Sequence, residues 1–200
     1  MVAVRNSAVS VEEYLRRELR AEHRNEYWNG TIVAMSGASQ SHNRIFVNLV
    51  RHLGNQLHGG QCSLFGSETR VYAAACTSYF YPDVQIVCGK VQRAPTEAET
   101  LLNPTVIIEV LSESTAAVDR GRKFACYRTL ESLQHYILID QYDYAIDVHV
   151  RRPDGTWNES FLRGLDARLQ LESYGISLPF ADVYDGVEID RDPAASITEG

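Results

Sequence analysis

The chain has 200 residues, 44% of them hydrophobic and 22% charged, which suffices for one domain with a sizeable core and excludes a largely disordered protein. Its formal net charge of −7 argues against a protein that coats nucleic acid with a broadly basic surface, although a local basic cleft is compatible with that charge. No apolar run approaches the roughly 18 residues of a membrane span, and the N-terminus lacks the apolar run of a signal peptide. We therefore expect one domain over residues 1–200, with a core at about 10–184 and loose termini at 1–9 and 185–200.

The N-terminal part of the chain carries signals for a helix and a hairpin. The run Ser10–Glu13 has the form of a capping box, which predicts a helix that continues to about His23. Asn29-Gly30 divides two strand-like runs, and this dipeptide suits the positive φ angles of a tight hairpin turn. We therefore expect a hairpin over residues 26–35, with Glu26 and Trp28 on one face.

The middle of the chain reads as one helix followed by several strands. A helix is expected at about 42–57, since Ile45, Leu49, Leu53 and Leu57 recur at helical spacing, and Gly59-Gly60 ends it. Strands are expected near 61–65, 68–75, 81–88 and 104–111, with a charged loop over 89–103. The last two strands are the most apolar, which predicts that they are central.

The remaining third of the chain returns to a helix and then to strands. Ser114 or Thr115 can cap a helix that runs to about Leu130, and alternating patterns predict paired strands at 135–140 and 145–151. A turn at Asp154-Gly155 leads into a further strand at 157–162. This order of elements predicts an α+β (α/β) fold in which a mixed sheet is flanked by helices.

Two of the predicted strands each carry one acid in apolar surroundings, Asp83 and Glu109. Burying a charge is costly without a partner or a metal, and neighbouring strands could bring the two acids to one cation. Carboxylates on rigid strands are hard oxygen ligands for Mg²⁺ or Mn²⁺, which commonly bridge to phosphates. A strand-end acid that accepts backbone N–H groups or pairs with arginine is the commoner arrangement for one acid alone. The joint occurrence favours metal-dependent phosphodiester hydrolysis.

Two further residues could join these acids. Glu26 is a candidate third carboxylate, with an exposed strand glutamate as an equally good interpretation on spacing alone. Lys90 and Lys123 are the only lysines, and Lys123 lies on the helix that follows the Glu109 strand, from which its amine could reach back. A compact ammonium can position a water nucleophile or stabilise a pentavalent phosphate, but a solvated helix lysine is the ordinary alternative.

Other charged and reactive residues give weaker signals. Four arginines are candidates for contacts with the phosphate backbone, although scattered surface arginines are the more frequent explanation. They are Arg44, Arg51, Arg120 and Arg122. The cysteines lack CxxC spacing and have apolar neighbours, so we expect buried, reduced thiols in a cytoplasmic protein. These cysteines are Cys62, Cys76, Cys88 and Cys126.

Three blocks of the sequence resemble the Uma-two family of predicted bacterial endonucleases, formerly a domain of unknown function, in the PD-(D/E)XK restriction-endonuclease-like superfamily. The blocks are Tyr81–Val84, Ile108–Thr115, and Asp119–Lys123 with Tyr127. The similarity spans about residues 10–184. It implies a restriction-endonuclease-like core, a metal-binding carboxylate cluster and, commonly, a homodimer.

The resemblance also assigns roles to single residues. It implies that Glu26, Asp83 and Glu109 bind Mg²⁺ (or Mn²⁺) and that these three act in catalysis with Lys123. The superfamily pattern places its lysine two residues after the second acid, where this chain has Leu111, and the resembling branch carries it at Lys123 instead. His42 and Gln85 match positions that support the acids.

These observations lead to one hypothesis and two alternatives. The leading hypothesis is an Mg²⁺-dependent endonuclease that hydrolyses DNA. One alternative is a catalytically inactive nucleic-acid-binding or dimeric assembly module that retains the nuclease fold, which the acidic charge favours. The other is a hydrolase of small phosphate esters. The nuclease hypothesis requires the three acids and the Lys123 amine to converge, and it fails if Lys123 points to solvent on the opposite helix face.

Overall fold

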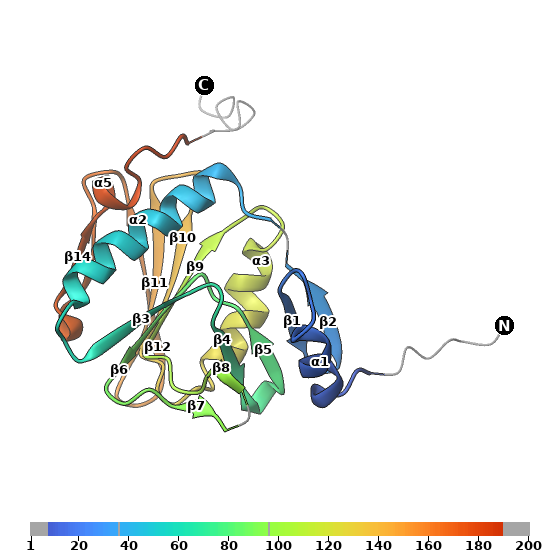
Figure 1. Ribbon diagram of the computed structural model, residues 1–200. Helices are drawn as coiled ribbons and strands as arrows, with labels where there is room; N and C mark the ends of the chain where they lie inside the picture. The colour runs from blue at the N-terminus through green and yellow to red at the C-terminus, as the bar shows by residue number, and fades with distance from the viewer. Residues whose placement is uncertain (1–7, 36, 96, 190–200) are drawn as a thin grey trace.

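Two six-stranded sheets form the framework of the fold (Figure 1). The computed structural model describes residues 8–35, 37–95 and 97–189. In spatial order, the sheet called here the central sheet consists of β12 (Trp157–Arg163), β11 (Ala145–Arg151), β10 (His135–Asp140), β9 (Val106–Leu111), β6 (Val84–Cys88) and β3 (Cys62–Gly66). β9 and β10 are parallel and the other pairs are antiparallel, so the sheet is mixed. The predicted α+β fold class is confirmed.

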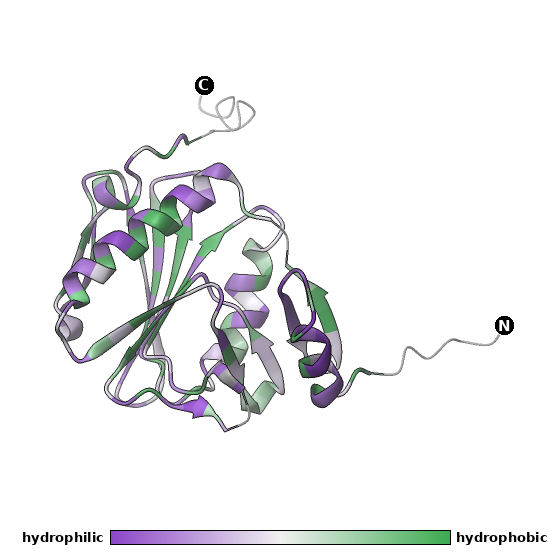
Figure 2. Cartoon of the chain, viewed as in Figure 1, coloured by the Kyte–Doolittle hydropathy of each residue, from purple (hydrophilic) through white to green (hydrophobic). Residues whose placement is uncertain are grey.

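The two most apolar strands lie inside the central sheet, as predicted. All six residues of β9 are buried, and only the last residue of β6 is partly exposed. Alternate side chains of these strands point to opposite faces. One face packs against α2 (Gln40–Leu57), through residues such as Ile45, Leu49 and Ile108. The other packs against Tyr127, Phe80 and their neighbours. Figure 2 shows hydrophobic colour along the central strands, whereas α2 alternates hydrophobic and hydrophilic bands.

The second sheet, called here the N-terminal sheet, begins with the predicted hairpin. Its strands in spatial order are β2 (Thr31–Ala34), β1 (Asn25–Trp28), β5 (Ser78–Phe80), β4 (Arg70–Ala73), β8 (Glu97–Leu101) and β7 (Arg93–Ala94). The turn between β1 and β2 has positive φ at both Asn29 (43°) and Gly30 (101°), as the sequence predicts. Pairing of β1 with β5 holds the hairpin beside the central region.

The first helix, α1 (Val11–Glu18), starts where predicted but ends earlier. Ser10 caps it by accepting a hydrogen bond from the Glu13 backbone N–H (3.1 Å). The expected end at His23 is wrong because the Glu18 carboxylate is buried and accepts hydrogen bonds from Asn25 N (2.9 Å) and the Tyr81 hydroxyl (3.0 Å). These bonds bring the chain back at once into β1.

Two strand pairs were missed by the sequence prediction. The expected loop over 89–103 contains β7 and β8, whose polar residues extend the edge of the N-terminal sheet. The C-terminal part contains a separate antiparallel pair, β13 (Arg168–Leu171) and β14 (Ile176–Pro179), followed by the short helix α5 (Phe180–Val183). β7 and β8 contain few apolar residues, whereas β13 and β14 do alternate but are only four residues long, which is too short for a clear period-two signal.

The segment after β9 is helical but not uniform. It consists of α3 (Ala116–Val118), a π-helical turn over Asp119–Lys123 and α4 (Phe124–Tyr127), so the prediction of one regular helix to Leu130 is wrong. Tertiary contacts of this turn, described below, override the local preference for an α-helix.

The expectation of reduced thiols is also wrong. Cys62 is bonded to Cys88, and Cys76 is bonded to Cys126. The first pair faces directly across β3 and β6, while the second joins the short turn after β4 to α4. Absence of CxxC spacing cannot reveal pairs that only the fold brings together.

The described parts of the two predicted loose ends are held by hydrogen bonds. Val9 N donates to Gly30 O (2.9 Å), and Asn48 Nδ2 donates to Asp185 O (2.9 Å). The rest of both ends, at 1–7 and 190–200, lies outside the described residues. Among the helices of the described ranges, none combines the length and apolar character needed to cross a membrane.

Candidate active site

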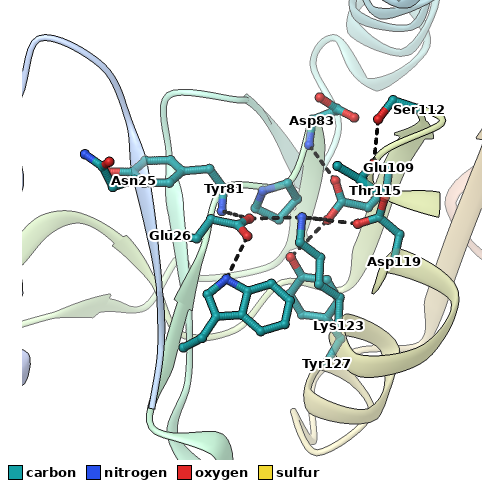
Figure 3. A network of polar contacts seen from close by, with 12 residues as sticks. Asn25, Glu26, Tyr81, Asp83, Glu109, Ser112, Thr115, Asp119, Lys123 and Tyr127 are labelled. Atoms are coloured by element: carbon teal, nitrogen blue, oxygen red, sulfur yellow. Dashed lines mark hydrogen bonds and ion pairs between the residues drawn. The ribbon is translucent and has the colours of Figure 1, made fainter. Parts of the chain in front are cut away.

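Glu109 lies in the middle of a polar cluster between the two sheets (Figure 3). It projects from β9 toward α4 and is 4% exposed. Its Oε1 accepts hydrogen bonds from Lys123 Nζ (3.2 Å) and the Tyr127 hydroxyl (3.1 Å), and its Oε2 accepts one from Asp83 N (3.4 Å). Burial raises the pKa of Glu109 well above its usual value, and Lys123 opposes that shift. The carboxyl group is therefore rigidly held in a place unfavourable to its charge.

Asp83 lies opposite Glu109 at the start of β6. Val84 pairs with Ile108, so the same antiparallel register places Asp83 beside Glu109. Asp83 Oδ2 accepts a hydrogen bond from Val110 N (2.7 Å), and Oδ1 lies 3.0 Å from His42 Nε2. The side chains of Asp83 and His42 are 14% and 16% exposed, more than the other members of the cluster, so solvent reaches the site on this side.

Lys123 is enclosed by three carboxylates. Its Nζ lies 2.9 Å from Glu26 Oε1, 3.2 Å from Glu109 Oε1 and 3.3 Å from Asp119 Oδ1. Burial alone lowers the pKa of the amine, but Glu109, Glu26 and Asp119 together raise it well above its ordinary value. Lys123 is thus a buried ammonium that faces the acids, and the alternative of a solvated helix lysine is excluded.

A π-helical turn brings Asp119 and Lys123 to the same site. Such turns are rare and are frequently found at functional sites. Asp119 O accepts a hydrogen bond from the Tyr136 hydroxyl (3.0 Å), and Arg120 pairs with the buried Asp147 (3.0 Å), so the turn is tied to β10 and β11. The sequence prediction missed Asp119, although its spacing of four residues before Lys123 was a usable signal.

Glu26 reaches the cluster from the N-terminal hairpin. Its Oε1 accepts a hydrogen bond from Tyr81 N (3.3 Å) and contacts Lys123, while its Oε2 accepts one from Trp28 Nε1 (3.1 Å). The predicted shared face of Glu26 and Trp28 is therefore present. Glu26 is therefore a direct partner of Lys123, and its role as a metal ligand stays a prediction.

The structure brings together all four residues expected in the site, and adds Asp119. Of the two supporting positions, His42 contacts Asp83 directly. Gln85 instead donates to Pro82 O (2.7 Å), next to Asp83, and its own Oε1 is buried without a partner among the described residues. Arg120 is bound to Asp147 and Arg51 lies near Asp185 (3.5 Å), so neither is as available for phosphate as predicted.

The chemistry of the cluster fits a divalent cation. Three carboxylates surround the Lys123 ammonium and Asp83 lies beside Glu109, and hard oxygen donors are what Mg²⁺ prefers. Within the described ranges, no group of three or more histidine, cysteine or acidic side chains is arranged to hold a metal. Mg²⁺ usually keeps several waters and needs only one or two carboxylates, so Asp83 and Glu109 are the residues that could hold it.

Replacing Tyr127 with phenylalanine tests how much the cluster depends on its hydrogen bonds. The change removes one donor to the buried Glu109 carboxyl group without changing the shape of the fully buried ring. We expect the free energy of unfolding to fall by about 1.5–3 kcal/mol, the range for hydrogen bonds to charged groups. Urea denaturation at neutral pH measures it. Tyr142→Phe is the matched control, because Tyr142 is 45% exposed; equal stability of the two variants would contradict the prediction.

Comparisons with known proteins identify the family of this chain. A family model named Uma2 and described as "Putative restriction endonuclease" matches residues 11–181. The chain is 36% identical over 170 residues to the uncharacterized protein sll1609 of Synechocystis sp., covering 85% of this chain and 96% of that protein. It is also 36% identical over 179 residues to the uncharacterized protein slr1290 of the same organism, covering 90% and 93%.

A solved structure shares the fold. It is a crystal structure titled a putative nuclease belonging to DUF820 from Anabaena variabilis, with a TM-score of 0.73 and 18% sequence identity. The match covers 90% of this chain and 99% of the other. The likeness confirms the restriction-endonuclease-like architecture expected from the sequence.

Proposed function

Because the chain belongs to the Uma2 family, we propose that it is a metal-dependent endonuclease that hydrolyses phosphodiester bonds in DNA. The observation that carries the proposal is the excess of buried acids around one lysine. This cluster of acids is accessible to solvent at Asp83 and His42. Such an excess of negative charge is costly to bury and is relieved when a divalent cation binds. We assign the metal to Asp83 and Glu109.

Each residue then has a distinct task. When bound, Mg²⁺ or Mn²⁺ lowers the pKa of a coordinated water and offsets charge on the phosphate. Asp83 and Glu109 hold the metal, and His42 orients the Asp83 carboxylate through its 3.0 Å contact. No covalent bond between the protein and DNA is required.

The contacts of Lys123 indicate how its amine could reach the reacting atoms. Of its three carboxylate contacts, the one with Asp119 is the longest, at 3.3 Å. Among the described residues, Asp119 Oδ1 has no partner with hydrogen-bond geometry, so this contact is an ion pair alone. We propose that Lys123 gives up this contact and donates to the attacking water or a phosphate oxygen. Glu26 and Glu109 keep the ammonium in place meanwhile.

Metal removal tests the proposed activity. We expect the purified protein to nick supercoiled DNA with Mg²⁺ or Mn²⁺, to stop when EDTA is added and to resume when the metal is restored. Gel electrophoresis of the plasmid measures this. Failure to cleave DNA with either metal would favour the inactive binding module.

Two further measurements separate the remaining alternatives. A chromogenic phosphodiester hydrolysed faster than DNA would identify a hydrolase of small phosphate esters. We also propose the homodimer that the resemblance implies. Sedimentation velocity of the full chain distinguishes a monomer from a dimer.

A further inference from the structure

A polar groove lies at the start of α2, beside the open side of the acid cluster. Its volume is about 540 Å³, within the range of sites that take small ligands. The walls come from the N-terminal half of α2, the turn between β10 and β11, and the segment after α5 (Figure 1). Nothing in the proposed cleavage chemistry uses this groove.

The groove lies on segments that also carry or contact residues of the candidate active site. Gln141, in its wall, donates from Nε2 to Leu111 O (2.6 Å), two residues beyond Glu109. Ser39, which caps α2, donates a hydrogen bond from its hydroxyl to Oε1 of Gln141. His42, which contacts Asp83, lies between the groove residues Ser41 and Asn43. A ligand bound in the groove would therefore lie beside the segments that carry His42 and Glu109.

The side chains of the groove offer two complementary contacts. Arg44 is exposed and makes no hydrogen bond or ion pair with any other residue that the structure describes. Its guanidinium lies against Gly186, where an added Cβ would come within 3.3 Å of it. Tyr142 also lines the groove, 45% exposed, on a turn fixed by the hydrogen bond from its N–H to Asp140 Oδ1 (2.8 Å).

Binding sites for single-stranded nucleic acids combine an exposed aromatic ring, on which a base stacks, with a positive charge that binds a phosphate. Tyr142 and Arg44 supply these two groups. The first turn of α2 carries no acidic residue, so its positive dipole end adds to the attraction. Glu188, also in the wall, acts in the opposite direction and repels phosphate.

We propose that this groove binds an unpaired stretch of DNA next to the scissile phosphate, with Arg44 on a phosphate oxygen and Tyr142 against a base. The inference rests on the proposed nuclease function and adds to it the strandedness and the path of the substrate. A groove of about 540 Å³ has room for a short unpaired segment.

Fluorescence anisotropy of a labelled single-stranded oligonucleotide, with the full chain in EDTA, measures binding without cleavage. Tyr142→Ala should weaken binding by roughly 5- to 100-fold, while Tyr142→Phe keeps wild-type affinity. Arg44→Ala should weaken binding several-fold and reduce the salt dependence by about one released ion. Glu188→Gln should strengthen it. Each substitution is at an exposed position, so folding is not at risk.

The controls are an exposed arginine and an exposed aromatic outside the groove, Arg20→Ala on the N-terminal side and Phe161→Ala on β12. The groove assignment would be overturned if the control variants lost as much affinity for the oligonucleotide as the groove variants. It would also be overturned if a duplex bound as tightly as the single strand. Plasmid cleavage by the wild type would in that case leave the nuclease function standing. Absence of both binding and cleavage in the wild type would overturn both.

Discussion

Replacing Lys123 with methionine is expected to abolish DNA cleavage and to lower the free energy of unfolding by about 3–5 kcal/mol at neutral pH. Methionine keeps most of the side-chain volume but removes the only cation within contact of Glu26, Glu109 and Asp119 in the described structure. Removing one partner of a buried charge cluster leaves the others uncompensated. Urea denaturation and plasmid cleavage measure the two effects separately.

The loss of stability should depend on pH in a definite direction. The pKa of Lys123 is raised, so its charge contributes stability at every pH below its unfolded value of about 10.4, and that contribution is lost only as the pH rises through the higher folded value. The pKa of Glu109 is also raised, so its ionisation opposes folding once the pH exceeds its unfolded value of about 4.3. The deficit of Lys123→Met should therefore shrink as the pH falls from 7 toward 4.5.

Lys90→Met is the matched control for this prediction. Lys90 is the other lysine of the chain and is exposed. Its replacement removes the same charge without touching the cluster, so stability and cleavage should stay at wild-type values. A Lys123→Met protein as stable as Lys90→Met at neutral pH would show that the amine does not balance the acids.

Replacing Asp83 with asparagine is expected to lower DNA cleavage by at least about 100-fold while the fold is retained. The amide oxygen can still accept the hydrogen bond from Val110 N, which the carboxylate accepts at 2.7 Å. What is lost is the negative charge that we assign to metal binding. Calorimetric titration with Mn²⁺ should then show weak or no binding, independently of any assay of activity.

Asp83→Ala and Asp166→Asn complete this experiment. The alanine variant also leaves Val110 N without its acceptor, so we expect it to be about 1–3 kcal/mol less stable than the asparagine variant. Asp166 is exposed, and its change to asparagine removes one acidic charge elsewhere on the chain. Cleavage by Asp83→Asn at the wild-type rate would identify a contaminating nuclease and remove the basis for the metal assignment.

The parts of the site that could be predicted are those fixed by sheet geometry. Asp83 and Glu109 sit in strands whose burial is evident from composition, and neighbouring strands in register bring such residues together. Lys123 was recognisable because lysine is rare in this chain and the helix follows directly on β9. Local sequence patterns were enough here because the pairing of the two strands leaves few other positions for these acids.

The parts that could not be predicted depend on tertiary contacts. Asp119 joins the site only through a π-helical turn that Tyr136 and Asp147 hold from neighbouring strands. The early end of α1 depends on a glutamate that is bonded to Asn25 and Tyr81. The cysteine pairs likewise follow from strand register and helix position. None of these contacts leaves a periodic signal in the sequence.

The position of Glu26 on an N-terminal hairpin bears on when the site can form during synthesis. Its contact with Tyr81 spans 55 residues of sequence, and Asp83 and Glu109 are separated by 26, whereas Glu109 and Lys123 are only 14 apart. Contacts between distant segments form late, because closing a long loop costs entropy before any interaction is gained. The hairpin, although made first, must wait for β5 and then for the Lys123 turn to leave the ribosome. A growing chain therefore holds its acids apart, and the full cluster assembles only after most of the domain has been synthesised.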